Sequence, residues 1–108
     1  MHWSISSSAR IQRSLDGGLT WEELHIDDSV VFRVVTTLEG EVWAGGSKGA
    51  LYSSGDQGAH WARVILSPSG PADAIVAINL RDRLHGSITT ATGDQWTTAD
   101  GGKHWARQ

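Results

Sequence analysis

Histidines are the side chains of this sequence best suited to acid–base or metal chemistry. A zinc site needs three or four convergent ligands, and cysteine, the other common zinc ligand, is absent. No two histidines are four residues apart, as the helical zinc motifs require. We therefore expect no metal site and no other cofactor. The five histidines are His2, His25, His60, His85 and His104.

Two of these histidines occupy the same place in a repeated motif. Three segments align without gaps, each with Ser or Thr, then Asp two residues later, Gly four residues later and Trp seven residues later. Their tryptophans are separated by 40 and 44 residues, a period that indicates four-stranded propeller blades. Because His60 and His104 belong to different blades, we expect them to lie far apart. The motif residues are Ser14, Asp16, Gly18 and Trp21; Ser54, Asp56, Gly58 and Trp61; and Thr98, Asp100, Gly102 and Trp105.

The motif favours a structural role over ligand binding. Short oxygen-bearing side chains at its start accept hydrogen bonds from turn amides, as in Asx-turns. The glycine is expected to supply a positive φ, which other residues reach only at a cost. The tryptophan opens the next strand and is expected to bury its ring under the turn or against the neighbouring blade. Replacing Asp56 with Ala should therefore destabilise the fold.

The elements that must hold these turns are strands, and no helical pattern is present. We predict an all-β fold, a partial β-propeller of about three blades whose first blade is incomplete and starts at its second strand. The blades are expected at 1–26, 30–66 and 73–108, with a linker at 67–71. The run from Val30 to Val35 is rich in β-branched residues, as in a strand buried on both faces. The strands expected in the second and third repeats are 32–38, 41–46, 50–54 and 61–66, and 74–80, 84–90, 95–98 and 105–107.

The similarity between repeats extends beyond the motif. Trp3 and Trp43 are 40 residues apart and align, and Tyr52 aligns with Trp96. In the third repeat, the segment 84–87 is aligned with 42–45. These pairings account for the remaining tryptophans as packing residues of repeated strands.

Charge and hydropathy narrow the classes of partner. The formal net charge is −3, and the arginines and lysines are scattered, whereas phosphate binding needs a concentrated basic surface. We therefore expect no nucleic-acid partner. No apolar run approaches 18 residues, so membrane insertion by this segment is not expected. The N-terminus lacks the basic and apolar regions of a signal peptide.

The repeats resemble the Asp-box repeats of bacterial neuraminidases, which are shared by sialidases, sortilin-type receptors and the photosystem II stability/assembly-factor family. The segment 41–52, followed by its Asp box, is most similar to the assembly-factor family. That resemblance implies a propeller that binds proteins and is not an enzyme, and it favours an extracytoplasmic or periplasmic location. It also implies that this chain is the C-terminal part of a larger bacterial protein.

A sialidase would need an arginine cluster and a nucleophilic tyrosine. The one tyrosine, Tyr52, lies where the third repeat has Trp96, which makes it a packing residue. We therefore expect no enzyme activity. Three functions remain open: a protein-interaction or scaffold module, a carbohydrate-binding module or fragment of a sialidase-like glycoside-acting protein, and a structural oligomerisation domain.

Eleven predicted strands leave the fan of blades open. A homodimer would supply 22 strands and would close a six-bladed ring, covering hydrophobic end faces at Val30–Val35 and on the third repeat. The alternative is a monomer whose N-terminal segment, with Trp3 and Ile5, covers the open face.

Overall fold

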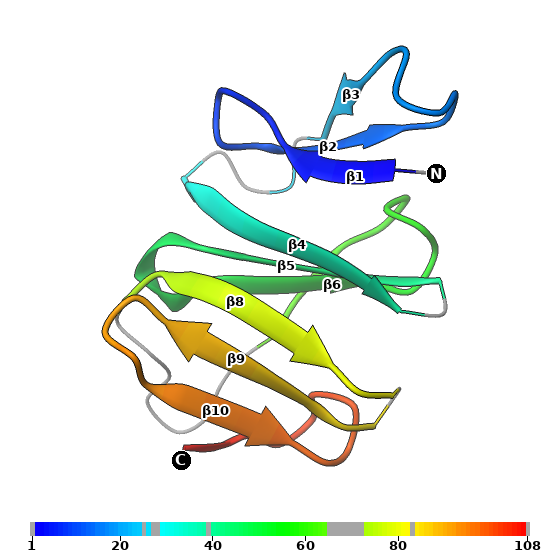
Figure 1. Cartoon of the computed structure of the whole chain (residues 1–108). Coiled ribbons are helices and arrows are strands. Elements are labelled where there is room, and N and C mark those ends of the chain that lie inside the picture. Colours follow the sequence, from blue (N-terminus) through cyan, green and yellow to red (C-terminus); the bar gives the residue numbers. More distant parts are fainter. Residues whose placement is uncertain are drawn as a thin grey trace.

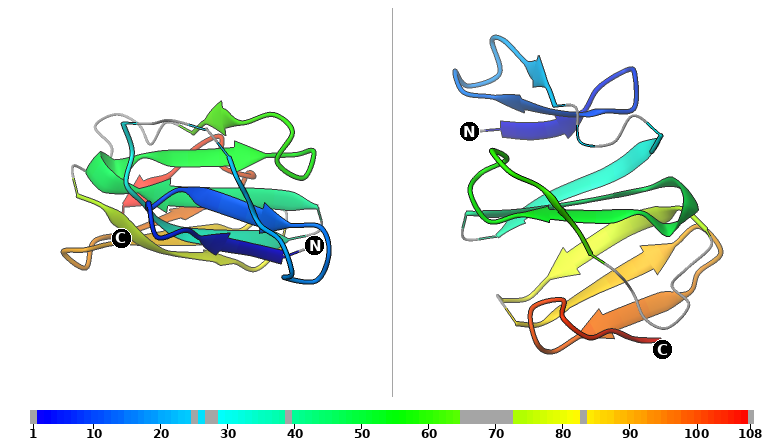
Figure 2. Two further views of the ribbon diagram at one scale, coloured as in Figure 1. Left: turned by 90° about the horizontal axis from the view of Figure 1, so that it is seen from above. Right: turned by 180° about the vertical axis from the view of Figure 1, so that it is seen from behind.

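The chain forms three antiparallel sheets stacked one on another, with the two termini at opposite ends of the stack (Figures 1 and 2). The computed structural model describes residues 2–24, 26, 29–38, 40–64, 73–82 and 84–107. The predicted linker and the predicted strand end at Ile65 and Leu66 lie outside this part of the chain. None of the described segments forms a helix long and apolar enough to cross a membrane.

The three sheets are consecutive in sequence, and we call them blades 1, 2 and 3. Blade 1 has three strands and blades 2 and 3 have four each, in the order in which they follow along the chain. This confirms the predicted all-β partial propeller with an incomplete first blade. The strands are β1 (His2–Ile5), β2 (Ile11–Ser14) and β3 (Glu22–Glu23); β4 (Phe32–Leu38), β5 (Glu41–Gly46), β6 (Leu51–Ser54) and β7 (Ala62–Arg63); and β8 (Ile75–Leu80), β9 (Gly86–Thr90), β10 (Gln95–Thr98) and β11 (Ala106–Arg107).

Most strands begin within a residue of their predicted start, and β9 is the exception. Its predicted first residues, Leu84 and His85, belong to the turn instead. Their backbone amides donate to Oδ1 of Asp82 at 2.8 and 2.7 Å, so the aspartate side chain takes up the hydrogen bonds that a longer strand would use. The predicted turn after β5 is a single 3-10 turn, η1 (Ser47–Gly49).

The core consists of two apolar layers, one between each pair of neighbouring blades. Alternation along β4 places Val35 in the layer with Ile11 of blade 1, whereas Val34 packs in the layer that contains Ile75 of blade 3. Strand β4 thus has blades on both faces, as its composition predicts. The expectation that Val30–Val35 forms an open end face is wrong, because this strand lies in the middle of the stack.

Register along the sheets fixes which residues of the three blades are equivalent. Trp3 pairs with Arg13, and Trp43 pairs with Ser53, each just before the first residue of an Asp box. In blade 3 the residue in that position is Ser87, which pairs with Thr97. The alignment of 84–87 with 42–45 is therefore wrong by two residues. Counting eleven residues back from the Ser or Thr of each box would have found Ser87.

Candidate functional site: the Asp-box turns and a recess on blade 3

Each Asp box closes the hairpin before the last strand of its blade with the same set of hydrogen bonds. In blade 2, the Ser54 hydroxyl donates to Asp56 Oδ1 at 2.7 Å and accepts the Gly58 amide at 2.8 Å. The His60 amide donates to the same carboxylate at 2.9 Å. Gly58 lies at φ +94°, a conformation that favours glycine. The two oxygen-bearing side chains thereby satisfy amides that the tight turn leaves unpaired.

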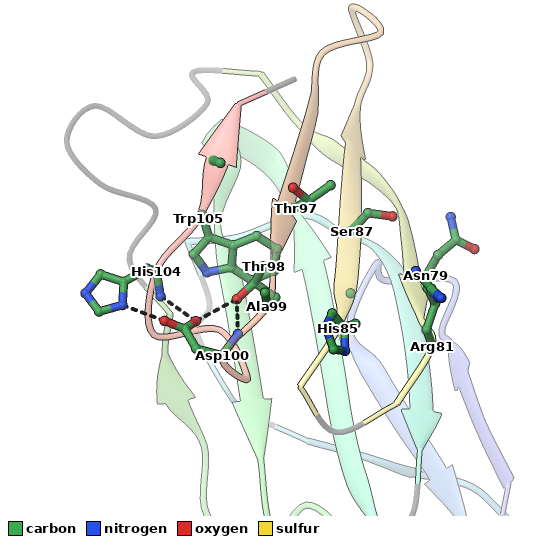
Figure 3. A pocket seen from close by; sticks show the side chains of 12 residues that line it. Asn79, Arg81, His85, Ser87, Thr97, Thr98, Ala99, Asp100, His104 and Trp105 are labelled. Carbon is green, nitrogen blue, oxygen red and sulfur yellow. Dashed lines mark hydrogen bonds and ion pairs between the residues drawn. The ribbon is translucent and has the colours of Figure 1, made fainter.

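Blades 1 and 3 repeat this arrangement. In blade 3, the Thr98 hydroxyl donates to Asp100 at 2.8 Å and accepts the Gly102 amide at 3.0 Å (Figure 3). In blade 1, the Ser14 hydroxyl donates to Asp16 at 2.8 Å. The geometry of all three turns is set by residues inside the box.

These hydrogen bonds stabilise the charged form of each aspartate. The Thr20 hydroxyl and then the Thr20 amide lower the pKa of Asp16 to about 2. The His104 amide, followed by its ring, lowers the pKa of Asp100 to about 2. The His60 amide holds the pKa of Asp56 well below its usual range. In each box, hydrogen bonds donated to the carboxylate are the main cause of the lowered pKa, so the aspartate acts as a hydrogen-bond acceptor in the turn.

The boxes of blades 2 and 3 also receive a tryptophan from the preceding blade. Trp43 of blade 2 reaches the box of blade 3, where a Cβ on Gly102 would lie 2.7 Å from its Cη2 atom. Its ring meets Trp105 edge-on, with centroids 6.3 Å apart. The Trp105 indole in turn donates to the carbonyl of Gly102 at 3.0 Å. The box of blade 3 is therefore a socket into which Trp43 of blade 2 fits.

The same contact joins blades 1 and 2. Trp3 meets Trp61 edge-on at 6.2 Å, and a Cβ on Gly58 would lie 2.5 Å from the Trp3 ring. The box of blade 1 receives no such ring from the described residues. There, Trp21 is 41% exposed and the space beside Gly18 is open except for Trp21 itself. Of the three predicted box tryptophans, Trp105 is buried, Trp61 is half-buried and Trp21 is exposed.

The histidines that the structure describes do not converge. His60 and His104 each bond the aspartate of their own box through Nδ1, at 2.6 and 2.5 Å, and His85 bonds Asp82 in the same way. Within the described residues, which exclude His25, no group of three or more histidines and carboxylates could hold a metal ion. Each His–Asp pair is local to one turn.

Tyr52 sits in an apolar environment between blades 1 and 2. Its ring lies against Phe32 with centroids 6.1 Å apart, and the Arg63 guanidinium lies 5.8 Å from the ring centre. Tyr52 pairs with Ala44 as Trp96 pairs with Ile88, which agrees with their sequence alignment.

A recess of about 590 Å³ opens on the face of blade 3 that points away from blade 2. Asn79, Ser87 and Thr97 project from three neighbouring strands along its floor, and Arg81 and His85 lie at one end (Figure 3). The box of blade 3 forms the other end, although the His104 ring turns away from the remaining residues drawn (Figure 3). Sequence reasoning missed this recess, because its position depends on the residue equivalent to Trp43.

Comparison with known proteins identifies the family. Residues 2–108 match the family model described as photosynthesis system II assembly factor YCF48. The chain is 30% identical over 105 residues to the photosystem II assembly lipoprotein Ycf48 of Synechococcus sp. (strain CC9902), covering 94% of this chain and 31% of that protein.

Solved structures give the same result. The structure described as YCF48 bound to D1 peptide has a TM-score of 0.81 and 25% identity, over 97% of this chain and 36% of that one. YCF48 from Cyanidioschyzon merolae has a TM-score of 0.79 and 26% identity, over 97% and 32% of the two chains. The chain thus spans about a third of the length of these relatives. On the match to the family model over nearly its whole length, the chain belongs to the Ycf48 family of photosystem II assembly factors.

Proposed function

We propose that this chain is a non-catalytic module that binds a polypeptide segment of a partner protein. The observation that carries the proposal is its similarity over 97% of its length to a YCF48 structure bound to a D1 peptide. A protein-interaction role is also what the resemblance of the repeats implies. The carbohydrate-binding alternative has no such support from the relatives.

The chemistry of the described residues supports the same proposal. The Asp boxes, which hold the most strongly perturbed carboxylates, use them to accept hydrogen bonds within their own turns. We propose that these boxes are structural in all three blades. Tyr52, the tyrosine that a sialidase-like reaction would have to use, lies between Phe32 and Arg63 in the packing between blades.

Direct binding measurements test the proposed function. The purified chain is titrated with the D1 peptide that its structural relative binds, using isothermal calorimetry, and with a scrambled peptide of the same composition as the control. Saturable binding of the D1 peptide alone supports the proposal. Absence of binding to it and to a panel of polypeptide tails, together with a selective response on a glycan array, would overturn the proposal in favour of carbohydrate binding.

A further inference from the structure

The Asp-box turn of blade 1 has an apolar tip that the other two boxes lack. Among the described residues, six large apolar side chains are exposed, and three of them, Leu15, Leu19 and Trp21, belong to this one turn. Leu15 is 67% exposed and Leu19 is 85% exposed. Single exposed apolar residues are ordinary, whereas a group of them with polar surroundings marks an interaction surface. We call Leu15 and Leu19 the leucine pair.

The exposure of the leucine pair does not depend on which part of the chain precedes blade 1. The equivalents of the pair are small or polar, namely Gly55 and Ala59 in blade 2 and Ala99 and Lys103 in blade 3. All four are exposed, although each of those two boxes receives a tryptophan from the blade before it. Trp21 is different, because its equivalents meet that tryptophan. The surface is therefore defined by the leucine pair alone.

The box holds the leucine pair in place before any partner binds. The Ser14 hydroxyl accepts the Gly18 amide at 2.8 Å, and the Thr20 amide donates to Asp16 Oδ1 at 2.9 Å. These bonds join the two arms of the turn, each of which carries one leucine of the pair. A partner thus meets two aliphatic side chains on a preformed backbone, which lowers the entropic cost of binding.

The net negative charge of the chain lies in its first blade. With histidine neutral, residues 1–28 hold five acidic and two basic residues, a net charge of −3, whereas residues 29–108 hold seven of each. Blade 1 therefore differs from blades 2 and 3 in charge as well as in the apolar tip of its box.

Cations do not compensate the hairpin that carries the leucine pair. Its one cation, Arg13, is bound to Glu22 at 3.3 Å. Among the described residues, no ion pair involves Asp16 or Glu23. In blades 2 and 3 a histidine ring faces the box aspartate, but in blade 1 that place holds Thr20, whose hydroxyl carries no charge. The neighbouring box of blade 2 also has no lysine or arginine.

We infer that the leucine pair is a docking site for a partner segment in which an apolar residue stands between lysines or arginines. The apolar residue packs on the pair, and the basic residues meet the carboxylates of Asp16 and Glu23. A membrane surface fits less well, because the negative potential of anionic lipids repels this hairpin. This inference rests on the proposed polypeptide-binding function and adds to it a surface and a kind of segment.

The test uses three synthetic nine-residue peptides in a Gly-Ser background, whose central residues are Lys-Leu-Lys, Lys-Ser-Lys or Asp-Leu-Asp. The isotope-labelled chain is titrated with each peptide up to millimolar concentration, and amide shifts are followed by NMR. The Lys-Leu-Lys peptide is expected to give saturable shifts at the amides of residues 15–20. The other two should bind at least about tenfold more weakly, because each lacks one of the two contacts.

Variants separate the leucine pair from the rest of the surface. Leu15→Ala/Leu19→Ala introduces the residue found at these positions in the boxes of blades 3 and 2, so it should melt like the wild type and lose binding at least about tenfold. Leu84→Ala removes a leucine that is 55% exposed on another turn and should leave binding unchanged. Glu23→Gln should weaken binding of the lysine peptide and reduce its sensitivity to salt.

Several outcomes would overturn the inference. Failure of the Lys-Leu-Lys peptide to bind, or equal binding to the wild type and to the double alanine variant, would show that the leucine pair is not the site. If the D1 peptide still binds that variant at full strength, the proposed function stands and this location is wrong. Co-sedimentation with phosphatidylcholine vesicles, or self-association, that is lost in the double variant would assign the pair to a lipid surface or to a second copy instead.

Discussion

Gly102→Ala tests whether the Asp boxes are sockets for the preceding blade. The added Cβ would lie 2.7 Å from Cη2 of Trp43, a ring that is 6% exposed and held in place by Trp105. Gly18 is the matched control, because it has the same place in its box and the same φ of +97°, yet its Cβ would meet nothing closer than 3.9 Å. Any cost of left-handed backbone is therefore common to both variants.

The expected difference follows from the overlap alone. Left-handed backbone costs an alanine roughly 1–2 kcal/mol at either position, and overpacking adds about 1–3 kcal/mol at Gly102 only. With roughly 4–8 °C per kcal/mol for a domain of this size, Gly102→Ala should melt at least about 4 °C below Gly18→Ala. Gly58→Ala, which overlaps Trp3 at 2.5 Å, should behave like Gly102→Ala.

Urea and thermal unfolding of the three variants provide the measurement. The double variant Trp43→Ala/Gly102→Ala should be less destabilised than the sum of its single changes, because removal of the ring removes the overlap. Equal destabilisation by Gly18→Ala and Gly102→Ala would refute the contact between Trp43 and the box of blade 3, since backbone strain alone would then explain both losses of stability.

Three further predictions concern the same contacts. Asp56→Ala should lower the melting temperature because the turn amides lose their acceptor. Glu23→Ala, at an exposed position, is the control. A melting temperature of Asp56→Ala equal to that of the control would show that the box does not stabilise the fold. Stability should fall as the pH drops from about 4 toward 2. The folded pKa of Asp16 and Asp100 is about 2 and the ordinary value is 3.8, so the unfolded chain binds protons at a higher pH than the folded chain does. In melts across that range, replacing all three box aspartates with Asn should flatten the dependence of stability on pH. Trp43→Ala should cost about 3–5 kcal/mol in urea unfolding, whereas Trp21→Ala should cost far less because that ring is 41% exposed, and similar losses for both would contradict the difference between the blades.

The local motifs could be predicted from sequence because their hydrogen bonds join residues two to four positions apart. Ser54, Asp56 and Gly58 form their turn without help from distant parts of the chain, so the spacing of residue types is enough to recognise it. The strands that flank each box follow from the repeat period. For this reason the fold class and most strand limits agree with the structure.

The recess was not predictable in the same way, because it depends on which residues share a row and which face meets another blade. Trp3 and Trp43 could be aligned because both are tryptophan, but the equivalent residue of the third repeat is Ser87, which this criterion does not find. An Asx-turn at Asp82 also displaced the start of β9, which an alignment by similarity of residues did not register. The polar character of the end face became visible only when Leu51 and Gln95 were matched through their strand pairings.

The most direct test of the account is an NMR titration of the folded chain with the D1 peptide that its structural relative binds. We predict saturable shifts of a defined set of amides with the D1 peptide, and no shifts with a scrambled peptide of the same composition. A folded chain whose spectrum does not change up to millimolar peptide, or that responds equally to the scrambled peptide, would contradict the account.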